Sequence, residues 1–204
     1  MDFLRRLRTF HEGVLAFGET LGDVTEPCKF VLDPLSGEPT LPVAAEAIRS
    51  QDVMLFAPDD SLDNPECLQV FATCTEINPN THEAADRWLA YHLKPTHARW
   101  AKLNIQSVKR LDEVIDGDLV RLANPLRQHE GALCKFANQH QAALANACER
   151  QLHTRPENPF AVGVDPWGLD LRARFGVLRL EFETPVSTPE EARTAISRTL
   201  QLAQ

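Results

Sequence analysis

Short apolar segments separated by proline- and glycine-rich turns fill most of the first 122 residues, and this feature constrains the fold more than any other. Residues 68–75 alternate apolar and polar side chains with a period of two, as a strand with one buried face does. Residues 30–33 and 40–43 flank Pro34–Pro39, whose prolines and glycine favour a hairpin connection. Further strand patterns occupy residues 52–56, 100–108 and 118–122. Because long helices do not alternate with these strands, the pattern predicts an antiparallel barrel and not a parallel sheet.

Two helices are expected within this strand-rich part of the chain. Apolar residues from Phe3 to Phe17 recur at spacings of three and four, which predicts an amphipathic helix within residues 2–19. Thr81, followed by Glu83 and an alanine pair, predicts the start of a second helix. That helix is expected to end before Pro95, because the residue that precedes a proline is forced out of the helical region.

The composition changes after Asn124, where we place a boundary between two domains, residues 1–124 and residues 125–204. A helical apolar stripe extends over residues 126–152, and three short strand patterns follow at 160–164, 169–172 and 177–182. Thr188 and Glu191 form a capping box with a proline between them, which predicts a helix from about residue 189 to 202. The expected fold class is therefore α+β: an antiparallel split β-barrel with an N-terminal helix, followed by a domain of helix, three-strand meander and helix.

Charge and cysteine usage narrow the environment and the partners. The formal net charge of -8 argues against nucleic acid as a partner, because phosphate capture needs clustered lysines and arginines. No apolar run has the length of a membrane span, and no secretory signal is recognised, so no membrane partner is expected. The five cysteines include no C-x-x-C pair, which favours reduced thiols and a cytoplasmic location.

The C-terminal part carries a family resemblance. Residues 161–172, followed by 177–182, Pro185-Val186 and Glu191-Ala-Arg193, resemble the C-terminal domain of HugZ-type haem-utilisation proteins. His140 with Leu144 fits the helix that opens that domain. In this branch of the FMN-binding split-barrel family, the domain follows a six-stranded barrel related to pyridoxamine 5'-phosphate oxidase. The resemblance implies a homodimer, a bound flavin or haem, and a redox or haem-utilisation role.

Two departures from the family leave an alternative open. The segment that commonly holds the FMN phosphate in these proteins is replaced by residues 57–65, whose three aspartates would repel a phosphate group. The haem-ligating histidine of the family's C-terminal tail has no counterpart before Gln204. The alternative is a degenerate barrel without a cofactor that binds a protein or acts as a regulatory module.

Five residues are the candidates for a cofactor site. An FMN site needs cations for the phosphate and an aromatic face for the ring, so Lys29, Arg49, Trp100 and Lys102 are the candidates for FMN. His140 is the candidate for a tetrapyrrole. Each residue also has a purely structural interpretation, as a solvated cation, a core tryptophan or a histidine hydrogen-bonded inside its domain.

The sequence predicts no metal centre and does not decide whether the protein is an enzyme. His92 and His97 flank Pro95 without a third ligand at a suitable spacing, so we interpret both as surface or capping residues. Neither a nucleophile elbow nor a phosphate-binding loop signature is found in the sequence.

Overall fold

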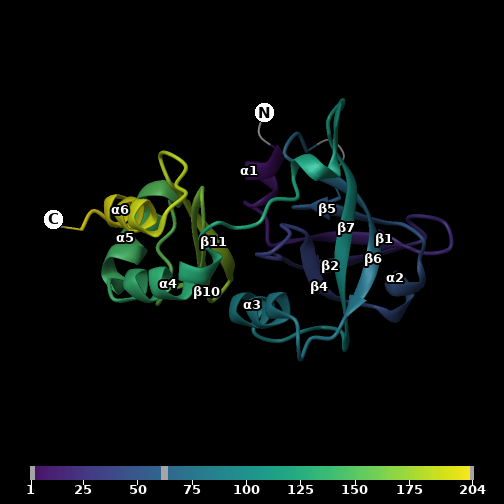
Figure 1. The fold of residues 1–204 in the computed structure, drawn as a ribbon, viewed down its shortest axis with the longest axis horizontal. Coiled ribbons are helices and arrows are strands. Elements are labelled where there is room, and N and C mark those ends of the chain that lie inside the picture. Colours follow the sequence, from purple (N-terminus) through teal and green to yellow (C-terminus); the bar gives the residue numbers. More distant parts are fainter. Residues whose placement is uncertain (1–2, 61–63, 203–204) are drawn as a thin grey trace. The chain divides into compact units, whose positions relative to one another are not determined.

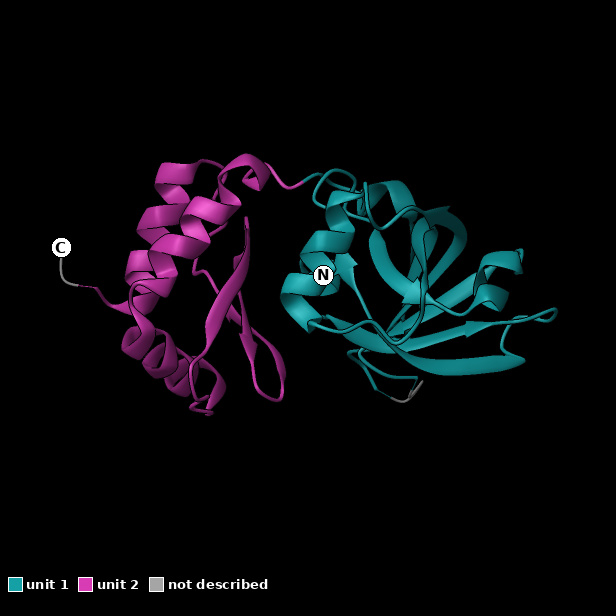
Figure 2. Ribbon diagram, turned by 90° about the horizontal axis from the view of Figure 1, so that it is seen from below, with its two compact units in different colours: residues 1–123 teal, residues 124–204 magenta. Residues whose placement is uncertain are grey.

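The computed structural model describes residues 3–60 and 64–202 of the chain. The chain divides into two compact units, residues 1–123 and residues 124–204 (Figure 2). Each unit combines an antiparallel sheet with helices and has a hydrophobic core of its own. The predicted α+β class is confirmed.

Unit 1, residues 1–123, is built on a curled antiparallel sheet that forms a split barrel (Figure 1). The strands follow one another in the order β2-β1-β5-β6-β7-β4-β3, and β8 pairs with β7. Their bounds are β1 Glu12–Phe17, β2 Val24–Lys29, β3 Val31–Leu32, β4 Pro39–Val43, β5 Val53–Ala57, β6 Leu68–Ile77, β7 Arg99–Arg110 and β8 Glu113–Asp116. The apolar side chains of these strands point inward and make a core that includes Leu15, Leu55 and Leu103.

The α-helices that accompany the barrel in its described residues are α1 Phe3–Leu7, α2 Ala45–Arg49 and α3 Glu83–His92. A 3-10 helix, η1 Gly117–Leu119, follows β8. Helix α3 packs on β3 and β4, and its N-terminus is capped by the His82 ring, which accepts a hydrogen bond from the Ala84 amide. This packing holds the C-terminal end of α3 beside the first barrel strands.

The β3–β4 hairpin confirms the turn predicted around Pro34–Pro39 and explains two of its residues. Gly37 has a φ of 77°, and a Cβ atom there would lie 2.6 Å from the Leu122 carbonyl oxygen, so the position needs glycine. The buried Glu38 carboxylate lies 3.0 Å from the Lys102 ammonium and 3.6 Å from the Arg121 guanidinium. The hairpin is therefore tied to β7 and to the segment after η1 by backbone contact and by charge.

The long N-terminal helix predicted for residues 2–19 is wrong beyond Leu7. Residues after α1 turn at Thr9, whose hydroxyl donates to the Arg6 carbonyl oxygen, and Glu12–Phe17 then becomes β1. Strand β1 lies between β2 and β5 and pairs with both. The spacing of Phe10, Val14 and Phe17 suits a helix, but pairing on both edges of the strand outweighs that local preference.

Two further strand predictions differ from the structure. No strand forms at the expected position 118–122, where the described chain instead contains most of η1. The strand that pairs with the end of β7 is β8, which comes earlier because the hairpin turns at Leu111 and Asp112 and pairs Arg110 with Glu113. Strand β2 begins at Val24, before the region in which strands were expected, although its exposed side chains and Pro27 are typical of an edge strand. The strands predicted at 52–56, 68–75 and 100–108 are confirmed as β5, β6 and β7.

Unit 2, residues 124–204, carries three helices on one face of a three-stranded sheet (Figure 2). The strands are β9 Phe160–Asp165, β10 Gly168–Ala173 and β11 Gly176–Glu181, in the order β11-β10-β9. The helices are α4 Glu130–Asn138, α5 Gln141–Leu152 and α6 Pro189–Leu200, and the 3-10 helix η2 Arg127–His129 precedes α4. The predicted meander and the predicted capping box of Thr188 and Glu191 are both confirmed.

The single helix predicted for residues 126–152 is broken into α4 and α5. Asn138 is the last residue of α4, and its side-chain amide donates to the Ala161 carbonyl oxygen at 3.0 Å and accepts from the Ala161 amide at 2.8 Å. The Asn138 side chain thus makes the same two kinds of hydrogen bond to the β9 backbone that a neighbouring strand would make. His140 follows as the N-terminal capping position of α5.

Candidate functional site

A groove of about 460 Å³ in unit 1 is the candidate binding site. It lies where the β1–β2 hairpin meets the C-terminal end of α3 and the segment that follows it. Its volume falls within the range of ligand pockets in proteins, about 300 to 1,000 Å³. The lining residues, drawn from four parts of unit 1, are Glu12, Gly13, Val14, Pro27, Cys28, Lys29, Pro58, Trp88, His92, Lys94 and Thr96.

Trp88 supplies the aromatic part of the groove and is fixed from two sides. Its indole Nε1 donates a hydrogen bond of 2.7 Å to the Lys29 carbonyl oxygen, and its ring meets the Trp100 ring edge-on at 5.3 Å between centroids. The side chain is almost fully buried. With 1% of its surface exposed and its N–H satisfied, the indole is a rigid apolar part of the groove wall.

His92 lies one helical turn after Trp88, and the two rings are 4.8 Å apart. The Nε2 atom is 3.1 Å from the Phe30 carbonyl oxygen, and because a carbonyl only accepts, Nε2 carries the proton. Burial, with smaller contributions from the nearby His11 and Lys29, lowers the pKa of His92 to about 4, against the opposing effect of the bond to Phe30. The imidazole is therefore neutral at physiological pH.

Two lysines give the groove its positive charge. Lys29 ends β2 and Lys94 follows α3, and both side chains are exposed. Neither ammonium group forms an ion pair or a side-chain hydrogen bond with any residue that the structure describes. Glu12 is the partner of Lys29 in the β1–β2 register but is not ion-paired to it. The lysines are thus available to an anionic ligand.

Cys28 and Gly13 form a pair in the same register and complete the part of the groove built by β1 and β2. Burial raises the pKa of the Cys28 thiol to about 12, helped by the charges of Glu26 and Glu12, so the thiol stays protonated. A Cβ atom at Gly13 would overlap the Phe56 carbonyl oxygen, so β1 needs glycine here to lie close to β5.

Of the five candidate residues from the sequence, Lys29 lines the groove and four lie elsewhere. Trp100 is in the core behind Trp88. Lys102 is bound to Glu38, Arg49 lines a separate polar cavity at the end of α2, and His140 is in unit 2, where its ring contacts Phe136 at 5.4 Å. The structure therefore brings Lys29 and Trp100 together through Trp88, but it leaves Arg49, Lys102 and His140 outside this site.

Sequence reasoning missed Trp88 and Lys94 as lining residues, and the interpretation of His92 as a surface or capping residue is wrong, because its ring is half-buried in the groove and bonded to Phe30. The one available signal was the spacing of four between Trp88 and His92, which places both on the same face of α3. In the 57–65 segment, which was expected to repel a phosphate group, Pro58 lines the groove and the Asp59 carboxylate accepts a hydrogen bond of 3.1 Å from the Asn64 side chain. Residues 61–63, including Asp63, lie outside the described residues.

Comparison with known proteins supports the fold but no particular activity. No protein-family model matches the sequence, and no curated protein is detectably related to it. The protein Atu2129 of Agrobacterium tumefaciens, of unknown function, has a similar solved structure, with a TM-score of 0.72 and 19% identity over 96% of this chain and 92% of that one. The fold is an α+β split barrel.

A haem-binding protein from Mycobacterium smegmatis also matches, with 20% identity over 95% of this chain and 92% of that one. Its TM-score of 0.39 is too low to support an argument about the present protein.

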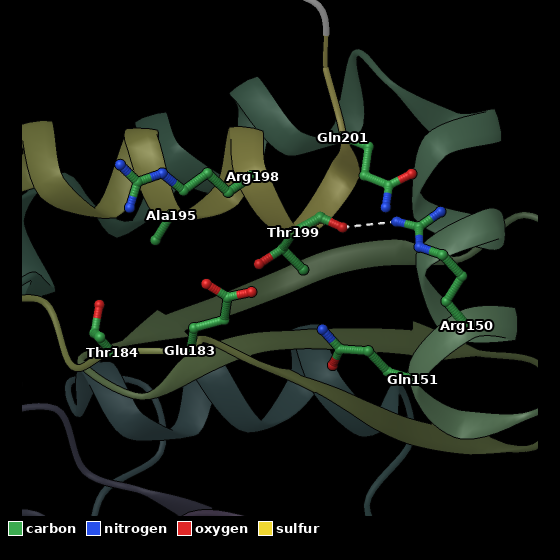
Figure 3. Close-up of a pocket in the computed structure, with 8 residues that line it drawn as sticks. All are labelled: Arg150, Gln151, Glu183, Thr184, Ala195, Arg198, Thr199 and Gln201. Atoms are coloured by element: carbon green, nitrogen blue, oxygen red, sulfur yellow. Dashed lines mark hydrogen bonds between the residues drawn. The ribbon is translucent and has the colours of Figure 1, made fainter.

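A cavity of about 210 Å³ lies in unit 2 between the ends of α5 and α6 and the loop after β11 (Figure 3). Figure 3 shows Arg150 reaching the Thr199 carbonyl oxygen, a hydrogen bond of 2.8 Å. The Gln151 amide is likewise occupied, by the backbone of Glu181. This cavity is smaller and contains no aromatic side chain, so it is a weaker candidate for a planar ligand than the groove.

Two searches of the described residues gave no further site. None of the helices within 3–60 and 64–202 has both the length and the apolar character needed to cross a bilayer. In the same ranges, histidine, cysteine and carboxylate side chains do not gather in groups of three that would hold a metal ion.

Proposed function

We propose that this protein belongs to the haem-utilisation branch of the FMN-binding split-barrel family and binds a planar aromatic cofactor, haem or FMN, in the groove of unit 1. The observation that supports this proposal is the juxtaposition, in a cavity of about 460 Å³, of a buried tryptophan with two lysines that form no ion pair with any described residue.

The chemistry of the groove suits a ligand with an apolar ring and an anionic group. The Trp88 and Val14 side chains supply apolar contact, while the Lys29 and Lys94 ammonium groups offer charge to a phosphate or to propionate carboxylates. In a flavin or haem protein, the cofactor carries the redox chemistry and the protein binds and orients it. A site of this kind needs no catalytic triad.

The remaining parts of the proposal come from the family resemblance in residues 161–182. We expect a cytoplasmic homodimer with a redox or haem-utilisation role. In this assignment, the barrel domain binds the cofactor and the C-terminal domain follows it as a separate folding unit.

The test is a titration of the purified full-length protein with FMN and with hemin, followed by fluorescence quenching and absorption. We expect saturable micromolar binding of at least one of them, weakened about tenfold in the double variant Lys29→Ala/Lys94→Ala, because each exposed charge pair contributes up to about 1 kcal/mol. Lys109→Ala, an exposed lysine on β7 outside the groove, is the matched control and should bind as the wild type does.

Lys102→Ala separates this groove from the site expected from the sequence. Because Lys102 is bound to Glu38 and does not line the groove, this variant should retain binding. Loss of binding in Lys102→Ala but not in the double variant would move the site away from the groove. A colourless protein that takes up neither ligand would favour the alternative, a barrel without a cofactor that acts as a protein-binding or regulatory module.

A further inference from the structure

The groove contains two side chains of the types that ligate haem iron in proteins, the imidazole of His92 and the thiol of Cys28. If either side chain were available to bond to the iron, the groove would bind haem more tightly than a metal-free ligand of similar shape. The contacts of each residue therefore decide which class of ligand the groove prefers.

His92 is committed to the protein through the nitrogen that usually binds haem. Its Nε2–H donates to the Phe30 carbonyl oxygen at 3.1 Å, which ties α3 to the start of the β3–β4 hairpin. The other nitrogen, Nδ1, is adjacent to the ring carbon that bears Cβ, so a macrocycle coordinated there would collide with the histidine's own side chain. Freeing Nε2 would leave the Phe30 carbonyl without its partner, at a cost of about 1–3 kcal/mol if it stayed buried.

Cys28 is unsuited for a different reason. The thiolate is the form that binds iron, and the burial of Cys28 between Glu12 and Glu26 keeps its proton in place, with a pKa of about 12.

We propose that the groove binds its ligand through anionic groups and ring contact, with no bond from a groove side chain to a metal. This inference rests on the proposed function and makes it more specific. The preferred class is a planar aromatic molecule with a phosphate monoester or a pair of carboxylates, which Lys29 and Lys94 receive while the ring lies against the apolar lining formed by Val14, Pro27 and Pro58. FMN and metal-free porphyrin dicarboxylates belong to this class as fully as haem does.

Four probes separate the charge of the ligand from its metal: hemin, metal-free protoporphyrin IX, FMN and riboflavin, each titrated into the full-length protein. Hemin and protoporphyrin IX are expected to bind with dissociation constants within about threefold of each other. Riboflavin, which lacks the phosphate, should bind about tenfold more weakly than FMN. Raising the salt concentration should weaken FMN binding and leave riboflavin binding nearly unchanged, because exposed charge pairs are screened.

The variant His92→Gln tests the role of the imidazole directly, because a glutamine amide can keep the hydrogen bond to Phe30 but cannot replace an imidazole bound to iron. The absorption spectrum of hemin bound to this variant should match that of the wild type. The inference is overturned if hemin binds at least about tenfold more tightly than protoporphyrin IX and its imidazole-type Soret band is lost in His92→Gln, although the groove would still be a tetrapyrrole site. If none of the four probes binds, the proposed function fails and this inference fails with it.

Discussion

The protonation of His92 depends on its position in the fold. Its ring is packed against Trp88, hydrogen-bonded to Phe30 and close to the charges of Lys29 and His11. Burial, aided by His11 and Lys29 and opposed by the bond to Phe30, disfavours the imidazolium, so the pKa of His92 drops from 6.5 to about 4. Between pH 6.5 and about 4, His92 is therefore neutral in the folded protein but takes up a proton in the unfolded chain.

This difference predicts how stability depends on pH. Between pH 6.5 and 4 the unfolded state binds the extra proton, so the free energy of unfolding should fall as the pH is lowered through this window, by up to about 3 kcal/mol from His92 alone. In His92→Gln that part of the slope should disappear. Urea unfolding of both proteins at pH 7, 6, 5 and 4.5 measures it. Parallel pH profiles for wild type and variant would contradict the assignment.

At the residue scale, the sequence identified Lys29 but not its neighbours in space. Lysine at a strand end is a plausible anion ligand from its charge alone, and it does line the groove. Trp88 and His92 became part of the site only because α3 packs on β3 and β4, which lie about 50 residues earlier in the chain. Lys102 was a candidate because of its charge, but it is paired with the buried Glu38. That pairing depends on the contact between the β3–β4 hairpin and β7, which the pattern of charges in the sequence does not reveal.

Among the elements, the β9–β11 meander contains a buried cluster of three charged residues. The Arg179 guanidinium on β11 lies 2.6 Å from Asp165 and 2.7 Å from Asp170, and all three residues are buried. Burial opposes the charged form of Arg179, but the two carboxylates outweigh it and raise the pKa of the guanidinium. Gly168 leaves room for this arrangement, because a Cβ atom there would lie 3.1 Å from the guanidinium carbon.

We expect Arg179→Met to destabilise unit 2 strongly. The change leaves two buried carboxylates without their cation, which typically costs about 3–5 kcal/mol. Arg198→Met, an exposed arginine of α6 in the same unit, is the control and should change stability by about 0.5 kcal/mol or less. Denaturant unfolding followed by far-UV circular dichroism measures both. Equal midpoints for the two variants would show that the Arg179 cluster contributes little.

Elements set by local chemistry were predictable, and elements set by distant pairing were not. The capping box of Thr188 and Glu191 and the turns of the meander act within a few residues, so α6 and β9–β11 follow from the sequence. The break between α4 and α5 requires Asn138 to meet Ala161, and β1 requires two partner strands. Helical spacing alone favoured the wrong structure in both places.

At the scale of the whole molecule, the two hydrophobic cores are separate clusters, one within the barrel and one between the helices and sheet of unit 2. The groove is formed entirely by residues of unit 1, and the family resemblance is strongest in unit 2. The binding proposal therefore depends on the Lys29, Trp88 and Lys94 side chains themselves and not on the residues that carry the resemblance.

The most direct test of the binding site is a two-dimensional 1H–15N NMR titration of the labelled full-length protein with FMN and with metal-free protoporphyrin IX. The three tryptophans provide internal reporters, since Trp88 lines the groove, Trp100 lies behind it and Trp167 is in unit 2. We predict that the Trp88 indole resonance and the amides of Gly13, Lys29 and His92 shift on binding while the resonances around Arg150 and Arg198 do not. Shifts centred on the unit 2 cavity, or no shifts with either ligand, would contradict the account.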